Sequence, residues 1–165
     1  MKKLLLLLPA LAFVSGLFPL ATNARIRSEE DLMTGKTNHL QFFFSETKVP
    51  NSIGMQEAAE IYVRCDGGKP MDIFISTPTF NADNRRVQVR WNQGEATPDY
   101  WTESSDSTAF FAPQPESFLK RMIQSNRLVF GWEPYQSADL AVAFNLTSQR
   151  ADLKRMAKLC GITLP

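Results

Sequence analysis

The sequence predicts a mainly β (α+β) fold, an antiparallel β-sandwich-like domain with two short helices and one disulfide. From about His39 onward, apolar and polar residues alternate, which is the period of a half-buried strand. Two later segments change to helical spacing. Only two of the 165 residues are cysteines, Cys65 and Cys160, and an export signal precedes them. The pair would therefore reach an oxidising compartment, where a disulfide persists.

The first 24 residues have the three parts of a signal peptide. Lys2 and Lys3 form a positive start, an apolar stretch runs from Leu4 to Leu20, and small residues precede Arg25. We expect cleavage after Ala24 and a periplasmic or secreted protein. The alternative is a retained membrane anchor, which two prolines and a glycine within the stretch disfavour.

Cleavage would change the length and the net charge of the chain. It would keep 141 residues and lose two of the 18 basic residues but none of the 17 acidic ones, so its formal net charge would be −1. Such a chain lacks the basic surface that binds nucleic acid or an anionic membrane. Residues 25–38 are polar, and we expect a loose arm or one short helical turn there. Residues 39–165 fit a single β-rich domain.

The first clear strand covers residues 60–65. Ile61, Val63 and Cys65 are expected on its core side, and Tyr62 and Arg64 on the opposite side. The residues that follow, Asp66-Gly67-Gly68, are typical of a tight hairpin turn with positive φ. The hairpin leads into a second strand over residues 71–77, with Met71, Ile73 and Ile75 facing alike.

Three more strands are predicted at residues 85–91, 128–132 and 140–146. In the first of these, Val87, Val89 and Trp91 are expected to face the core, and the intervening Arg86, Gln88 and Arg90 to face solvent.

The two helices are predicted at residues 115–125 and 148–160. Their apolar faces are Phe118, Leu119, Met122 and Ile123 in the first, and Leu153, Met156, Ala157 and Cys160 in the second. Pro115 suits a first helical turn, Thr147 or Ser148 suits a helix N-cap, and Gly161 suits a helix end.

Both cysteines are thus expected to face the core, Cys65 from a strand and Cys160 from a helix end. We expect a disulfide between them. In a reducing compartment, two free buried thiols acting as small apolar side chains would be the alternative.

Several motifs together resemble a known family: Ile-Tyr-Val-Arg-Cys at 61–65, Val-Gln-Val-Arg-Trp at 87–91, the segment 101–106, Pro-Glu-Ser-Phe at 115–118 and Leu-Lys-Arg-Met-Ala-Lys-Leu-Cys-Gly at 153–161. They resemble the small exported domain of type VI secretion accessory proteins and of related uncharacterised secreted proteins. The resemblance spans about residues 58–162. It implies a β-sandwich-like domain with a strand-to-helix disulfide and a periplasmic accessory or binding role, and it includes no catalytic signature.

Groups suited to catalysis are few, and we expect no enzyme and no cofactor. The single histidine, His39, fits a hydrogen-bonded strand residue better than a general base. Ser104, Ser105 and Ser107 lack the motifs that surround nucleophilic serines. One histidine and two separated cysteines are too few for a structural zinc site. The Asp66-Gly67-Gly68-Lys69 stretch joins two strands and so differs from a phosphate loop, and the carboxylates of Glu95 and Glu103 have no supporting pattern.

A binding role depends on Tyr62, Arg64 and Arg90, which all occupy outward strand positions. Together they would form a basic aromatic patch suited to a protein partner. The alternative is that they are ordinary solvent-facing residues whose arginine stems cover the sheet. Trp91, Trp101 and Trp132 are better explained as core residues than as a groove. We expect an exported, non-catalytic accessory or binding protein of the cell envelope, linked to type VI secretion through the resemblance. The alternatives are an inhibitor of an envelope-attacking enzyme or a small hydrolase.

Overall fold

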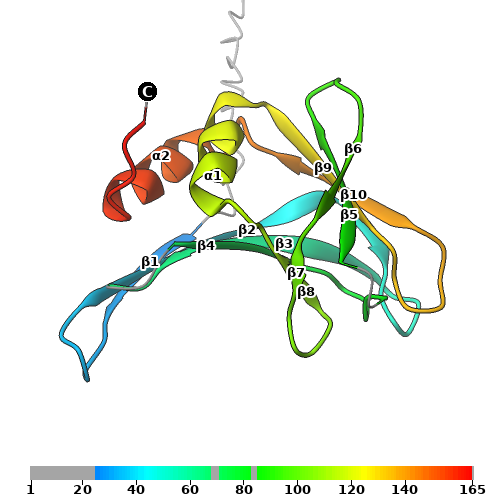
Figure 1. Ribbon diagram of the computed structural model, residues 1–165, viewed down its shortest axis with the longest axis horizontal. Helices are drawn as coiled ribbons and strands as arrows, with labels where there is room; N and C mark the ends of the chain where they lie inside the picture. The colour runs from blue at the N-terminus through cyan, green and yellow to red at the C-terminus, as the bar shows by residue number, and fades with distance from the viewer. Residues whose placement is uncertain (1–24, 68–70, 83–84, 165) are drawn as a thin grey trace, which may run out of the picture.

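The computed structural model describes residues 25–67, 71–82 and 85–164, and it confirms the predicted fold class. Two antiparallel sheets and two short helices form a sandwich-like domain (Figure 1). The larger sheet has the strand order β1-β2-β3-β4-β8-β7, with β1 at Arg25–Glu30, β2 at Thr37–Pro50, β3 at Gln56–Cys65, β4 at Asp72–Ser76, β7 at Thr102–Glu103 and β8 at Ala109–Phe111. The smaller sheet has the order β10-β9-β5-β6, with β5 at Arg86–Trp91, β6 at Thr97–Tyr100, β9 at Arg127–Trp132 and β10 at Leu140–Asn145.

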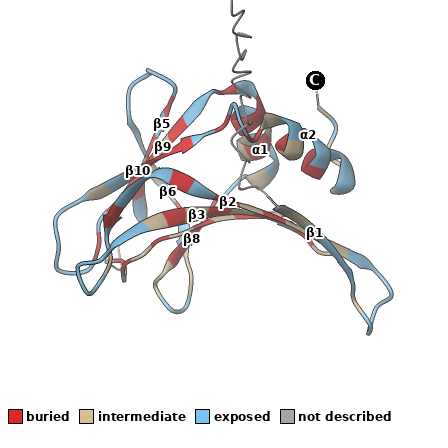
Figure 2. Cartoon of the chain, turned by 180° about the vertical axis from the view of Figure 1, so that it is seen from behind, coloured by how far each residue is buried: buried red, intermediate tan, exposed pale blue. Residues whose placement is uncertain are grey.

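The helices and the four-stranded sheet lie on the same side of the six-stranded sheet (Figure 1). The core fills the space between them, and the buried residues face it from both sheets and both helices (Figure 2). In the part of the chain that the structure describes, no helix or second sheet covers the opposite side of the six-stranded sheet, which we call its outer face. No described helix is both long and apolar enough to cross a membrane.

Alternation correctly predicted which residues of β3, β4 and β5 face the core. Ile61, Val63 and Ile73 are 0–1% exposed, and Val87 and Val89 are also buried. The ends of the predicted strands differ by one or two residues, except that β3 begins four residues earlier than expected, at residue 56. All three tryptophans are buried, as expected of core residues.

The prediction of a loose arm or helical turn at residues 25–38 is wrong, because residues 25–30 form β1. This strand pairs antiparallel with β2, so that Arg27 lies opposite Leu40 and Ser28 opposite His39. The segment has few apolar residues, but Ile26 packs against the core and pairing with β2 satisfies backbone groups that a loose arm would expose to water.

Strand β2 also connects the two sheets. Its pairing with β3 shifts register between Phe44 and Lys48, which marks a β-bulge. Within this bulge, Thr47 Oγ1 accepts a hydrogen bond of 2.8 Å from the backbone N–H of Ala143 in β10. The bulge therefore fixes one edge of the smaller sheet to the larger one.

The β3–β4 hairpin is present, but Gly67 does not have the predicted positive φ. Its N–H instead donates a hydrogen bond of 3.0 Å to Asn38 Oδ1. A Cβ atom at this position would collide with the Cβ of Lys36, so close packing against the β1–β2 hairpin requires the glycine. Gly68 lies outside the described residues.

The helices are α1 at Pro115–Gln124 and α2 at Arg150–Leu159. Pro115 lies in the first turn of α1, and Gly161 follows α2 with a φ of +71°, both as predicted. The predicted cap at Thr147 or Ser148 is wrong, because the N-cap of α2 is Gln149, which makes no side-chain cap hydrogen bond. The helix instead begins after a turn in which Ser148 Oγ donates to the backbone carbonyl of Asn145.

The predicted disulfide joins Cys65 at the end of β3 to Cys160 at the end of α2, with 5.7 Å between their Cα atoms. Cys65 is buried, whereas Cys160 is only half-buried, because it lies at the C-cap, just beyond the apolar face of the helix. The bridge therefore fixes the last helix against the six-stranded sheet.

Candidate functional site

Four aromatic side chains form a row across the outer face of the six-stranded sheet. The strand registers place Phe42 of β2 opposite Tyr62 of β3, Tyr62 opposite Phe74 of β4, and Phe74 opposite Phe111 of β8. Because directly opposite residues point to the same side of a sheet, all four lie on one face. Each is half-buried. We call these four residues the aromatic row.

The rings of the aromatic row stack on one another. Ring centroids are 5.7 Å apart for Phe42 and Tyr62, 4.7 Å for Tyr62 and Phe74 and 5.0 Å for Phe74 and Phe111. The two closest rings are nearly parallel, at 7°. Since neighbouring rings occupy the ring faces, solvent contacts mainly ring edges. The row is thus unlike a flat platform on which a sugar ring could lie, and its edges carry the partial positive charge of the aromatic quadrupole.

Charged side chains flank the aromatic row. The guanidinium of Arg27 lies 5.7 Å from the centre of the Phe42 ring, and that of Arg64 lies 5.7 Å from the centre of the Phe74 ring. Arg64 also forms a 2.8 Å ion pair with Asp72, its cross-strand neighbour. Arg64 is therefore held in place within the sheet, while Arg27 lies on the exposed first strand.

Tyr62 also makes a polar contact at the aromatic row: its hydroxyl donates a hydrogen bond to the carboxylate of Glu60. The pKa of Tyr62 is raised from its ordinary 10.0 to about 12. Burial is the largest cause, and the hydrogen bond to Glu60 and the negative charge of Glu60 act in the same direction, whereas the positive charge of Arg27 lowers this pKa.

This raised pKa predicts a loss of stability in alkali. Between pH 10.0 and about 12 the unfolded chain loses the Tyr62 proton while the folded chain keeps it, so the free energy of unfolding should fall as pH rises through this window. Urea unfolding at a series of pH values measures the fall. Tyr62→Phe should make the curve flatter, and an unchanged slope in this variant would contradict the assignment.

The structure does not bring Arg90 together with Tyr62 and Arg64. Tyr62 and Arg64 extend from β3 on the outer face of the six-stranded sheet, whereas Arg90 lies on β5 of the four-stranded sheet, exposed on the side away from the core. The three residues therefore do not form one patch. Sequence alternation placed Tyr62 on the outward side of its strand, but it did not identify Phe42, Phe74 and Phe111 as its neighbours.

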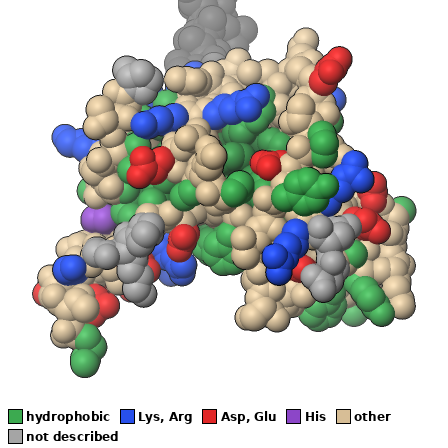
Figure 3. Space-filling view, viewed as in Figure 1, with side chains coloured by type: hydrophobic (Ala, Val, Ile, Leu, Met, Phe, Trp, Pro, Cys, Tyr) green, Lys and Arg blue, Asp and Glu red, His purple; other side chains and the backbone are tan. Residues whose placement is uncertain are grey.

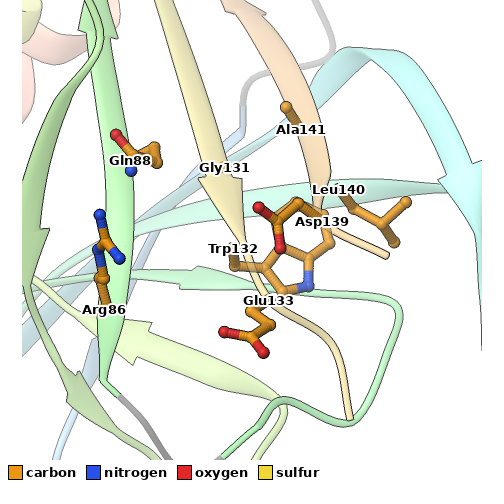
Figure 4. Close-up of a pocket in the computed structure, with 8 residues that line it drawn as sticks. All are labelled: Arg86, Gln88, Gly131, Trp132, Glu133, Asp139, Leu140 and Ala141. Atoms are coloured by element: carbon orange, nitrogen blue, oxygen red, sulfur yellow. The ribbon is translucent and has the colours of Figure 1, made fainter. Parts of the chain in front are cut away.

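A shallow depression of about 260 Å³ lies on the four-stranded sheet (Figure 4). Gly131 of β9 lines it, and a Cβ there would lie only 3.3 Å from the Cβ of Gln88. Arg86 and Gln88 extend from β5 at one side, and Glu133 and Asp139 add carboxylates near the ends of the neighbouring strands. One arginine and two carboxylates border an open, shallow space, so the depression has no clear preference for one class of ligand.

A second depression, of about 310 Å³, lies between β6 and the first half of α1. The guanidinium of Arg121 lies 4.8 Å from the centre of the Trp91 ring, and Asp99 accepts a hydrogen bond of 3.0 Å from Trp101 Nε1. The charged groups beside this depression are thus engaged with the aromatic core, which is a structural role.

Residues that could support catalysis do not converge within the described part of the chain. The Nδ1 atom of His39 lies 2.8 Å from Ser28 Oγ, and Ser104 Oγ lies 2.6 Å from Asp106 in a separate hairpin. Glu103 belongs to the six-stranded sheet, while Glu95 follows β5 of the other sheet. Among the described residues, no three His, Cys, Asp or Glu side chains form a group that could hold a metal ion.

No family model matches the chain, and no curated protein matches it. A solved structure, the invasion associated protein B of Bartonella henselae, is similar over 80% of this chain and 91% of its own, with 9% sequence identity and a TM-score of 0.48. A similarity at this level supports no conclusion about function.

Proposed function

We propose that the chain is an exported, non-catalytic binding protein of the cell envelope, which recognises a protein partner through the outer face of its six-stranded sheet. The observation that carries this proposal is the aromatic row, four partly exposed rings on a sheet face that no described helix or sheet covers. Aromatic side chains and arginine are enriched in protein interfaces, and contiguous apolar patches on a surface mark such sites.

The shape of this face supports the same proposal. In the space-filling view the molecule is hollowed below the sheet, between the β1–β2 hairpin at lower left and the rest of the chain (Figure 3). Phe44, which is 43% exposed, extends the apolar surface beside Phe42. A concave, apolar surface favours a convex partner that can exclude water from the rings.

The charges around the row are mixed, because Glu60 accepts a hydrogen bond from Tyr62 and Asp72 pairs with Arg64. Ring edges carry partial positive charge, and Arg27 adds a full positive charge beside them. Carboxylates and backbone carbonyls of a partner would be attracted to the ring edges and Arg27, and its basic groups would be attracted to Glu60, so we expect a partner surface with both charges.

Export is supported by the Cys65–Cys160 disulfide, because such bonds persist in oxidising compartments outside the cytoplasm. The link to type VI secretion stays a prediction based on the sequence resemblance alone. Inhibition of an envelope-attacking enzyme would use the same surface, and the identity of the partner would distinguish the two roles.

Site-specific photo-crosslinking in cells that produce the protein tests the surface. A benzophenone amino acid at Phe44, beside the aromatic row, should give a discrete crosslinked product with a partner, because this position lies at the proposed interface. Mass spectrometry of the product would then identify the partner as a secretion component or as a hydrolase.

The matched control is the same amino acid at Arg90, which is also exposed but lies on the other sheet. We expect no discrete product from that position. Equal products from both positions, or none from Phe44, would reject the outer face as the binding surface.

A further inference from the structure

Strand β1 lies at the edge of the six-stranded sheet. Within the described residues it pairs with β2 on one side and with no strand on the other. Its six residues contain no proline, and no bulge interrupts the register with β2. An edge strand of this kind exposes a row of backbone N–H and C=O groups that can pair with another strand.

The charges on β1 are complementary to those of a second copy of the same strand. Arg27 and Glu29 are two residues apart, so they point to the same side, and both are exposed. If two copies of β1 pair antiparallel with Ser28 opposite Ser28, Arg27 of each copy lies opposite Glu29 of the other. Directly opposite side chains lie about 5 Å apart at Cβ, which allows two ion pairs across the junction.

Other registers are less favourable. A shift by two residues in one direction places Arg27 opposite Arg27, and in the other direction it places Glu29 opposite Glu29, and like charges in these positions repel. A shift by one residue would place the outer face of one sheet beside the core side of the other, which the helices cover.

We propose that two copies of the chain associate through β1, paired antiparallel and centred on Ser28, so that their six-stranded sheets join into one continuous sheet. The two-fold axis would be perpendicular to the sheet, and each copy would contribute the same surface, as in most homodimers. Both aromatic rows would then lie on the same side. This inference does not depend on the proposed function, because it concerns the edge of the sheet and not its face.

A charge-swap experiment tests the register. Arg27→Glu alone places a new carboxylate opposite Glu29 in both halves of the junction, and Glu29→Arg alone places two guanidinium groups opposite one another. Each variant should dimerise on the order of tenfold more weakly than the unmodified protein. An equimolar mixture of the two variants should form a mixed dimer more readily than either variant pairs with itself. In that mixed dimer two carboxylates of one copy would face two guanidinium groups of the other, so every cross-strand pair joins opposite charges.

Sedimentation equilibrium of the mature protein at low salt, about 50 mM, measures the dimer dissociation constant. Arg90→Glu, a charge reversal on the other sheet, is the matched control and should leave it unchanged. A mixture that dimerises no better than either variant alone would reject this register. A protein that stays monomeric at all concentrations would reject the dimer.

Discussion

Replacing both bridging cysteines, as Cys65→Ala with Cys160→Ala, is expected to lower the free energy of unfolding by about 4 to 5 kcal/mol. The bridge joins residues separated by 95 positions, so it restricts most of the unfolded chain, and the chain-entropy account assigns larger effects to longer loops. This loss is a large part of the roughly 5 to 15 kcal/mol by which a domain is stable. Urea unfolding of the purified proteins under non-reducing conditions measures it.

The unmodified protein treated with a reducing agent is the control, and it should unfold at nearly the same urea concentration as the double variant. If the free energy of unfolding of the double variant fell by less than about 1 kcal/mol, the bridge would contribute little to stability, and the chain-entropy account would fail for this chain.

Phe130→Ala should lower the free energy of unfolding by about 3 to 5 kcal/mol. Phe130 is 0% exposed in β9 and lies between the two sheets. Its ring centre lies 5.1 Å from that of Trp101 and 5.9 Å from that of Phe110, which belongs to β8 of the six-stranded sheet. Truncation would leave a cavity where both sheets meet, and thermal or urea unfolding would show the loss.

Phe44→Ala is the comparison variant for this experiment. It removes the same side chain from a position that is 43% exposed, so we expect a loss below about 1 kcal/mol. Similar losses in both variants would mean that burial at Phe130 does not determine its contribution.

How far the sequence could predict this structure depends on whether a feature is local. Alternation in residues 61–65 and 87–91 correctly separated core-facing from outward-facing positions, because the side chains of a strand alternate whatever its neighbours are. The same rule could not show that Arg64 and Arg90 lie on different sheets, since it describes one strand at a time.

Features that depend on distant parts of the chain were missed. The aromatic row exists because four strands pair in one register, and nothing within residues 71–77 indicates that Phe74 lies beside Tyr62 and Phe111. Likewise, β1 is stable as a strand because β2 pairs with it, although its own composition is polar. Gly67 is required by the approach of residues 36–38 and not by its own turn.

The contact between the β2 bulge and β10 affects the order in which the domain can form. The N–H of Ala143 donates to Thr47 Oγ1 across 96 positions of the chain, so this junction can form only when β10 has come together with β2. Until β10 and α2 are in place, Phe43 of β2 lacks its contact to Phe144 of β10. A partly folded chain therefore has uncovered apolar surface, and folding should be slow in comparison with a helical protein of similar length.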